Sequence, residues 1–96
     1  MSYFIAKVEE RNGEYQSEDI FMVEAPNAKA AEERVIDLLK HEWRGKAQAQ
    51  VGSTELGSIF YFFGGEISGR LREITQIEKS TALDLKLKGI LPLYHA

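Results

Sequence analysis

The chain has 96 residues, a formal net charge of −3, no cysteine, 44% hydrophobic and 28% charged residues. This length predicts a single domain over residues 1–96, and the balanced composition argues against disorder. The absence of cysteine excludes a disulfide framework and thiol chemistry, and no apolar run approaches the ~18 residues that span a bilayer.

The first predicted element is a β-hairpin within residues 3–25. Asn12-Gly13 separates two strand-like runs, and Asn-Gly is a strong hairpin signal because both residues tolerate positive φ. A two-residue turn there predicts three favourable cross-strand pairs: Phe4–Phe21, Ile5–Ile20 and Lys7–Glu18.

A helix from about Ala28 to Arg44 follows. Asn27 stands where alternation gives way to helical spacing, and its side chain suits the N-cap, while Gly45 suits the position after the helix. Its apolar residues fall on one side, so we expect it to pack on a sheet. They are Ala28, Ala31, Val35, Ile36, Leu38, Leu39 and Trp43.

Residues 45–57 are compatible with a short edge strand at Ala47–Val51 or with a flexible connection. Gly64-Gly65 then predicts the turn of a second hairpin. Its register pairs Phe62 with Ile67, Phe60 with Gly69, Tyr61 with Ser68, Ile59 with Arg70, and Phe63 with Glu66.

The run Ile59–Phe63 is apolar on both faces, whereas a half-buried strand alternates apolar and polar residues. We expect Phe60 and Phe62 to pack under the helix, which leaves Ile59, Tyr61 and Phe63 on the other face. The alternation changes phase near Arg72-Glu73, which predicts a bulge or a strand end there.

The C-terminal segment has two readings. Ser80 or Thr81 can cap a short helix that closes at Gly89, but Leu83, Leu85 and Leu87 alternate as a strand would. We favour the helix. The predicted fold is therefore α+β, in the order β-hairpin, helix, β-hairpin, short C-terminal helix, with an antiparallel sheet and the main helix packed on one face.

The sequence predicts no catalytic, cofactor or metal site. His41 and His95 are isolated, the histidine and glutamate at 41–42 lack the second histidine of a zinc motif, and the glycine spacings match no nucleotide loop. Carboxylates near the tip of the first hairpin are interpreted as a solvated acidic rim: Glu9, Glu10, Glu14, Glu18 and Asp19. We therefore expect a protein that is not an enzyme, and the N-terminal residues lack a signal-peptide pattern, which favours the cytoplasm and no membrane partner.

A candidate interaction surface arises if both hairpins join in one sheet. It consists of Ile59, Tyr61, Phe63 and Arg70, with Tyr3, Ile5, Ile20 and Met22 on the matching face of the first hairpin. Three outcomes are open: the C-terminal leucines cover it, a second copy of the chain binds it, or another protein or a nucleic acid binds it.

A single-stranded nucleic acid is the alternative partner, since Tyr61 and Phe63 can stack on bases beside Arg70 and Arg72. The charge distribution disfavours it: residues 1–42 carry five Lys/Arg against ten Asp/Glu, and residues 43–96 carry seven against five. We therefore predict a non-enzymatic protein-interaction module that forms a homodimer.

Three segments, "YFIAKVEERNGEY", "FMVEAPNAKAAEERV" and "LREITQIEKSTALDLKLKGILP", resemble small uncharacterised hairpin–helix proteins of bacterial and phage genomes. The resemblance covers about two-thirds of the chain and rests on structural motifs, so it transfers no functional residue. Because phage versions often act as adaptors or inhibitors of host machinery, it implies a binding role with an unspecified target.

Overall fold

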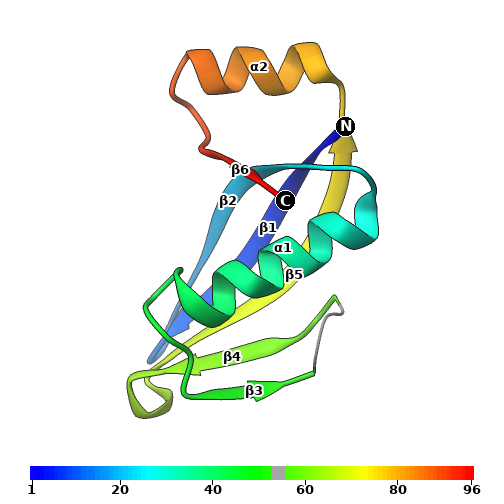
Figure 1. Ribbon diagram of the computed structural model, residues 1–96. Helices are drawn as coiled ribbons and strands as arrows, with labels where there is room; N and C mark the ends of the chain where they lie inside the picture. Colours follow the sequence, from blue (N-terminus) through cyan, green and yellow to red (C-terminus); the bar gives the residue numbers. More distant parts are fainter. Residues whose placement is uncertain (53–55) are drawn as a thin grey trace.

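The computed structural model describes residues 1–52 and 56–96, and these form a twisted sheet with the longer helix across one face and the shorter helix near the end of the sheet where the N-terminus lies (Figure 1). The elements are β1 (Ser2–Asn12), β2 (Tyr15–Ala25), α1 (Ala28–His41), β3 (Ala49–Val51), β4 (Ile59–Phe62), the 3-10 turn η1 (Phe63–Gly65), β5 (Ile67–Ile77), α2 (Lys79–Leu87) and β6 (Leu93–His95). In the described part of the chain the sheet has six strands in the order β3-β4-β5-β1-β2-β6.

The α+β class is confirmed, but the prediction of a purely antiparallel sheet is wrong. β6 pairs with β2 in parallel, whereas the other described strand pairs are antiparallel. The predicted element order also lacked β3 as a definite strand and lacked β6 altogether. None of the helices in the described ranges is both long and apolar enough to cross a membrane.

The first hairpin forms, but its register differs from the predicted one by two residues. The turn residues are Gly13 and Glu14, so Asn12 pairs with Tyr15 and Phe4 lies opposite Val23. Gly13 has a φ of +62°, the conformation that the first position of a type II′ turn requires. A two-residue shift keeps every side chain on its face of the sheet, so the predicted inside and outside of the hairpin hold.

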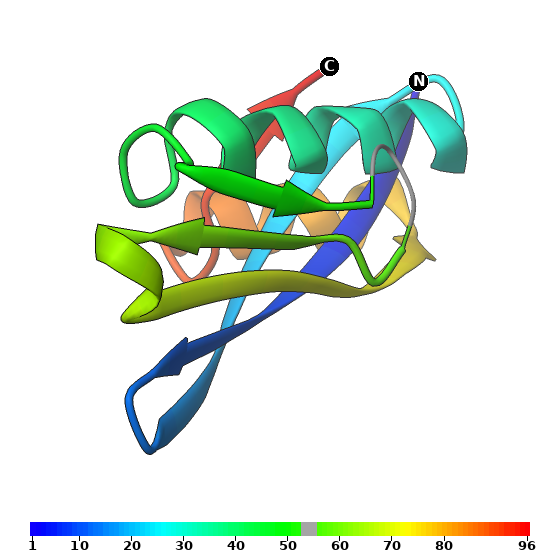
Figure 2. The ribbon, with the colours of Figure 1, turned by 90° about the horizontal axis from the view of Figure 1, so that it is seen from below.

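Helix α1 begins as predicted, because the Asn27 side chain accepts a hydrogen bond from the Ala30 N–H at 2.8 Å. It packs across one face of the sheet, which Figure 2 shows from below. The core between them contains Val35 and Leu39 from the helix and Phe4, Phe60 and Leu71 from the sheet.

The helix ends three residues earlier than expected, at His41, and this releases Trp43 onto the sheet. A Cβ added to Gly69 would lie only 2.4 Å from Cζ3 of Trp43, so the indole occupies the space above this glycine. Trp43 also contacts Phe62 edge to face, with ring centroids 5.6 Å apart. Glycine at position 69 thus permits the close approach of helix end and sheet.

The second hairpin has the predicted pairs from Ile59–Arg70 to Phe62–Ile67. The expected pairing of Phe63 with Glu66 is wrong, because Phe63 lies in η1 with a φ of +51° and the connection is longer than two residues. β3 pairs with β4 as an edge strand, which confirms one reading of residues 45–57; residues 53–55 of that segment lie outside the described residues.

The predicted bulge is confirmed. Lys7 of β1 pairs with Glu73 and the next residue, Val8, pairs with Leu71, so Arg72 is the extra residue of β5. The C-terminal helix is also confirmed as α2, and Gly89 follows it with a φ of +67°. The predicted cap is wrong, because the helix begins at Lys79 after Glu78, which places Ser80 and Thr81 inside its first turn.

Candidate functional site

The face of the sheet opposite α1 is divided into two halves. At one end, α2 and the segment after it cover Tyr3, Ile5, Met22 and Ile77 through Ala82, Leu85, Leu91 and Leu93. Tyr3, Met22 and Ala82 are buried there. We call this end the covered half and the remainder, toward the turns of the two hairpins, the open half.

The open half contains a hollow of about 290 Å³ lined by Glu9, Arg11, Ile59, Tyr61, Ser68 and Arg70. We call these six residues the open patch. Three adjacent strands supply them: β4 gives the two apolar residues, β5 gives Ser68 and Arg70, and β1 gives the Glu–Arg pair. The sheet register places Ile59 opposite Arg70 and Tyr61 opposite Ser68, so the apolar and polar parts adjoin.

Glu9 organises the polar part of the patch. Its carboxylate accepts hydrogen bonds from Arg11 Nε (3.2 Å), Gln16 Nε2 (3.1 Å) and Arg72 Nη1 (3.1 Å), and the residue is only 9% exposed. The bulge at Arg72 lets this side chain reach Glu9 across the sheet. Buried carboxylates need such partners, so the interpretation of Glu9 as part of a solvated rim is wrong.

Arg70 is the half-buried cation of the patch. Its Nε atom is buried and lacks a hydrogen-bond partner within the described residues. It lies between Ile59 of β4 and Glu9 of β1 in the sheet register. A buried N–H without a partner is uncommon in folded proteins, so Arg70 has donor capacity that the described residues leave unused.

The structure brings together only part of the predicted surface. Ile59, Tyr61 and Arg70 meet in the open patch, as expected for one face of β4 and β5. Tyr3 and Met22 are buried in the covered half, and Ile5 is half-buried against the same cluster. Ile20 is half-buried opposite Lys7, and Phe63 is 59% exposed in η1, outside the patch.

The sequence interpretation missed Glu9 and Arg11 as patch residues. Alternation from Ile5 places Glu9 and Arg11 on the same face as Tyr61, and this signal was available. What the sequence does not reveal is that β1 lies between β5 and β2, which brings Glu9 within reach of Arg72.

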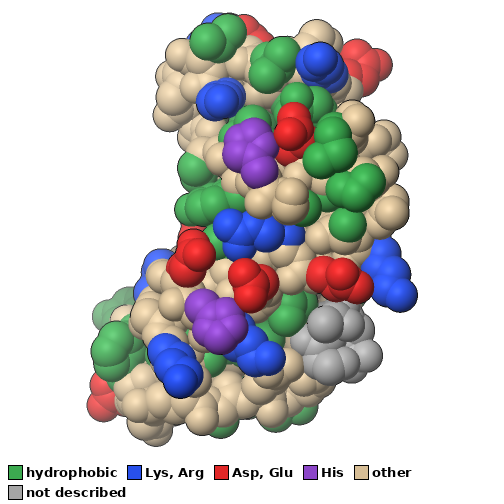
Figure 3. All heavy atoms as spheres, in the orientation of Figure 1, with side chains coloured by type: hydrophobic (Ala, Val, Ile, Leu, Met, Phe, Trp, Pro, Cys, Tyr) green, Lys and Arg blue, Asp and Glu red, His purple; other side chains and the backbone are tan. Residues whose placement is uncertain are grey.

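A second polar cluster lies on the α1 face, where charged side chains of both signs are interspersed across the middle of the molecule (Figure 3). Arg44 donates to both carboxylate oxygens of Glu10 at 2.9 Å and stacks over the Trp43 ring at 4.2 Å. The hydrogen bonds to Glu10 raise the pKa of Arg44 above its ordinary value. Trp43 Nε1 donates to Asp19 at 2.8 Å. Glu10 and Asp19 therefore anchor the end of α1 to the hairpin.

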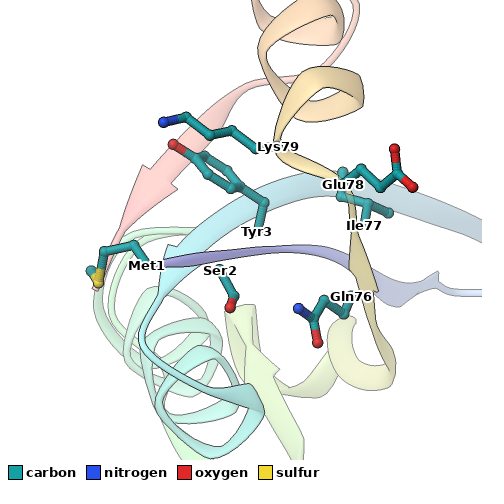
Figure 4. Close-up of a pocket in the computed structure, with 7 residues that line it drawn as sticks. All are labelled: Met1, Ser2, Tyr3, Gln76, Ile77, Glu78 and Lys79. Atoms are coloured by element: carbon teal, nitrogen blue, oxygen red, sulfur yellow. The ribbon is translucent and has the colours of Figure 1, made fainter.

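Another hollow, of about 490 Å³, lies beside the first residues of β1 and the junction of β5 with α2 (Figure 4). The side chains of Met1, Glu78 and Gln76 point in different directions and do not converge on one position. This hollow therefore lacks the convergent polar groups of a ligand site.

Among residues 1–52 and 56–96, no group of three or more His, Asp or Glu side chains is arranged to hold a metal ion. Comparison with protein-family models, with curated proteins and with solved structures found no match for this chain.

Proposed function

We propose that the protein is a cytoplasmic, non-enzymatic interaction module that forms a homodimer through the open patch. The observation that supports this is the division of one sheet face: α2 covers one half, and the other half leaves Ile59 and Tyr61 beside Arg70 without a cover from the described residues. Aromatic and arginine side chains are the residues that most often anchor protein interfaces.

The charges of the open half suit self-association. A two-fold interface places a surface of one copy against the same surface of the other copy. A surface that carries both positive and negative groups can therefore complement itself. The open patch carries Arg11 and Arg70 beside Glu9, and Glu18 lines an adjoining hollow of about 430 Å³ that shares Glu9. The guanidinium of Arg70 in one copy would then lie near carboxylates of the other copy.

Binding, rather than catalysis, is also the role that adaptors and inhibitors perform, so the proposal agrees with the resemblance to phage proteins.

The test is the dependence of sedimentation mass on protein concentration for the wild type and for Tyr61→Ala. We expect the measured mass of the wild type to approach twice the monomer mass. The dissociation constant of the Tyr61→Ala dimer should be about tenfold higher or more, so the variant is monomeric at concentrations at which the wild type is still a dimer. Tyr15→Ala is the matched control, because Tyr15 is 83% exposed and lies on the α1 face of β2. A wild type that stays monomeric, or equal effects of the two substitutions, would refute the proposal.

Single-stranded nucleic acid is a second candidate partner, favoured by the position of Tyr61 next to two arginines in one hollow. Against it, Glu9 already binds Arg11 and Arg72. Fluorescence anisotropy with a labelled single-stranded oligonucleotide measures nucleic-acid binding, and sedimentation mass measures dimerisation, each at low and high salt. Phosphate contacts weaken steeply with salt, whereas a dimer interface centred on Ile59 and Tyr61 persists.

A further inference from the structure

The outer edge of β2 is paired along only part of its length. β6 covers Met22–Glu24, and the Met22 N–H donates to the Pro92 carbonyl at 2.9 Å. Because backbone groups alternate sides along a strand, the N–H and C=O groups of Gln16, Glu18 and Ile20 point to the same outer side as those of Met22. Within the described ranges no strand pairs with β2 at these three residues, which we call the free β2 edge.

A pocket of about 240 Å³ lies next to this edge, on the α1 face of the sheet. Phe21, Trp43 and Tyr94 give it aromatic walls, and Asp19 and Glu42 give it carboxylates. A strand added along the free β2 edge would direct every second side chain toward this face. The pocket is therefore placed to receive a side chain of such a strand.

The charges of this region are predominantly acidic. Arg44 also lines the pocket, but its guanidinium is held by Glu10 through two hydrogen bonds of 2.9 Å. Asp19 is held in position by Trp43 Nε1. Glu18 belongs to the free β2 edge, and its side chain lies on the face opposite the pocket. A partner strand would therefore lie near carboxylates on both faces of the sheet and near aromatic side chains on the α1 face.

We propose that the free β2 edge binds an extended basic segment of a partner protein, which adds a strand to the sheet and places a lysine or arginine side chain in the pocket. Main-chain hydrogen bonds supply affinity in this mode of recognition, and pockets for alternate side chains supply specificity. The alkyl stem of the basic residue packs along Trp43 and Tyr94, and its cation meets Asp19 and Glu42.

A second copy of this chain does not fit the edge. Two-fold pairing of β2 with itself would bring Glu18 and Asp19 of both copies together, and like charges across a strand pair are destabilising. The pocket of this site lies on the face opposite the open patch, which is proposed to bind a second copy, and Glu18 adjoins both surfaces.

The experiment uses the full chain and a short fluorescent peptide of alternating valine and lysine, with a valine–glutamate peptide as the control. We expect the basic peptide alone to bind and to slow the amide hydrogen exchange of Gln16, Glu18 and Ile20. Binding without protection of these amides, equal binding of the acidic peptide, or no binding would overturn the proposal. So would protection that appears without peptide as the protein concentration rises, because that would indicate self-pairing.

Two pairs of variants separate charge from backbone pairing. Glu42→Lys should weaken binding of the basic peptide about fivefold, whereas Glu33→Lys, an equal change of charge at an exposed position of α1, should not. Glu18→Pro removes an outward donor and leaves the pairing with β1 in place, so it should abolish binding where Glu18→Gln retains most of it. Equal effects within either pair would count against the proposal.

Discussion

The covered and open halves of one sheet face are built from the same strands yet are completed in different ways. In the covered half, β1, β2 and β5 present Tyr3, Met22 and Ile77, and α2 and the segment after it pack against them. In the open half the same strands present Glu9, Glu18 and Arg70 beside the half-buried Ile20, and among the described residues β4 adds Ile59 and Tyr61. A sheet face that is apolar along its whole length must be covered along its whole length. This face instead becomes more polar beyond the half that α2 covers.

This comparison predicts a large stability cost for a truncation in the covered half. Met22→Ala removes a side chain with no exposed surface and should lower the free energy of unfolding by about 2–4 kcal/mol. Urea denaturation monitored by circular dichroism measures the change. A loss below about 1 kcal/mol would mean that α2 does not pack tightly on this half.

A smaller but clear cost is expected for Glu9→Ala in the open half. The substitution removes a buried carboxylate that accepts three hydrogen bonds, and we expect a loss of about 1–3 kcal/mol in the free energy of unfolding. Because Arg11 and Arg72 are exposed enough to be hydrated again, the effect should stay below that of Met22→Ala. Glu9→Gln keeps the shape of the side chain, so it should lower the free energy of unfolding less than Glu9→Ala does. A Glu9→Ala variant as stable as the wild type would show that these hydrogen bonds do not stabilise the fold.

Acid should weaken the end of the sheet where β2 meets β6. Hydrogen bonds from Tyr3 and His95 lower the pKa of Glu24 from its ordinary value of 4.5. The charged carboxylate therefore stabilises the fold above about pH 4.5, and this contribution is lost as the pH falls through the lower, folded-state pKa. Unfolding free energies between pH 3 and pH 7 should show a smaller acid-side decrease in Glu24→Gln than in the wild type.

The same contact has an effect at alkaline pH. The interaction with Glu24 raises the pKa of Tyr3 above its ordinary value of 10.0, so its contribution is present below pH 10 and is lost as the pH rises through the folded-state pKa. Glu33→Gln, at an exposed position of α1, is the control for both pH ranges, and an unchanged pH profile for Glu24→Gln would contradict this assignment.

The smallest stability effect is expected for Tyr61→Ala, below about 1 kcal/mol in the free energy of unfolding at monomeric concentrations, because Tyr61 is only half-buried and projects into an open hollow. Thermal denaturation of dilute protein measures it. A loss as large as that of Met22→Ala would mean that Tyr61 is a core residue and that the open patch is not a surface.

Local patterns in the sequence predicted much of this division. The alternation in Ile59–Phe62 assigned each side chain to its face, the phase change near Arg72 predicted the bulge, and Asn27 predicted the start of α1. Ile59, Tyr61 and Arg70 were predicted to share a surface because neighbouring strands of a hairpin fix their positions locally.

Features that depend on distant contacts were not predictable in the same way. Gly13 rather than Asn12 occupies the first turn position, and its N–H donates to the Glu66 carbonyl of the second hairpin. β6 has three residues, and no turn motif in the sequence marks it as a strand. It forms because the chain after α2 lies beside the edge of β2. Glu9 is buried because β1 lies between β5 and β2, an order that no local pattern specifies.

An isotope-filtered NOE measurement on a mixture of labelled and unlabelled protein tests whether two copies associate through the open patch. We expect contacts between copies at the Ile59 methyl groups and the Tyr61 ring, and none at Ile77, which packs against α2. Contacts between copies at Ile77 or along α2, or no contacts between copies at millimolar concentration, would contradict the claim that the open patch is the self-association surface.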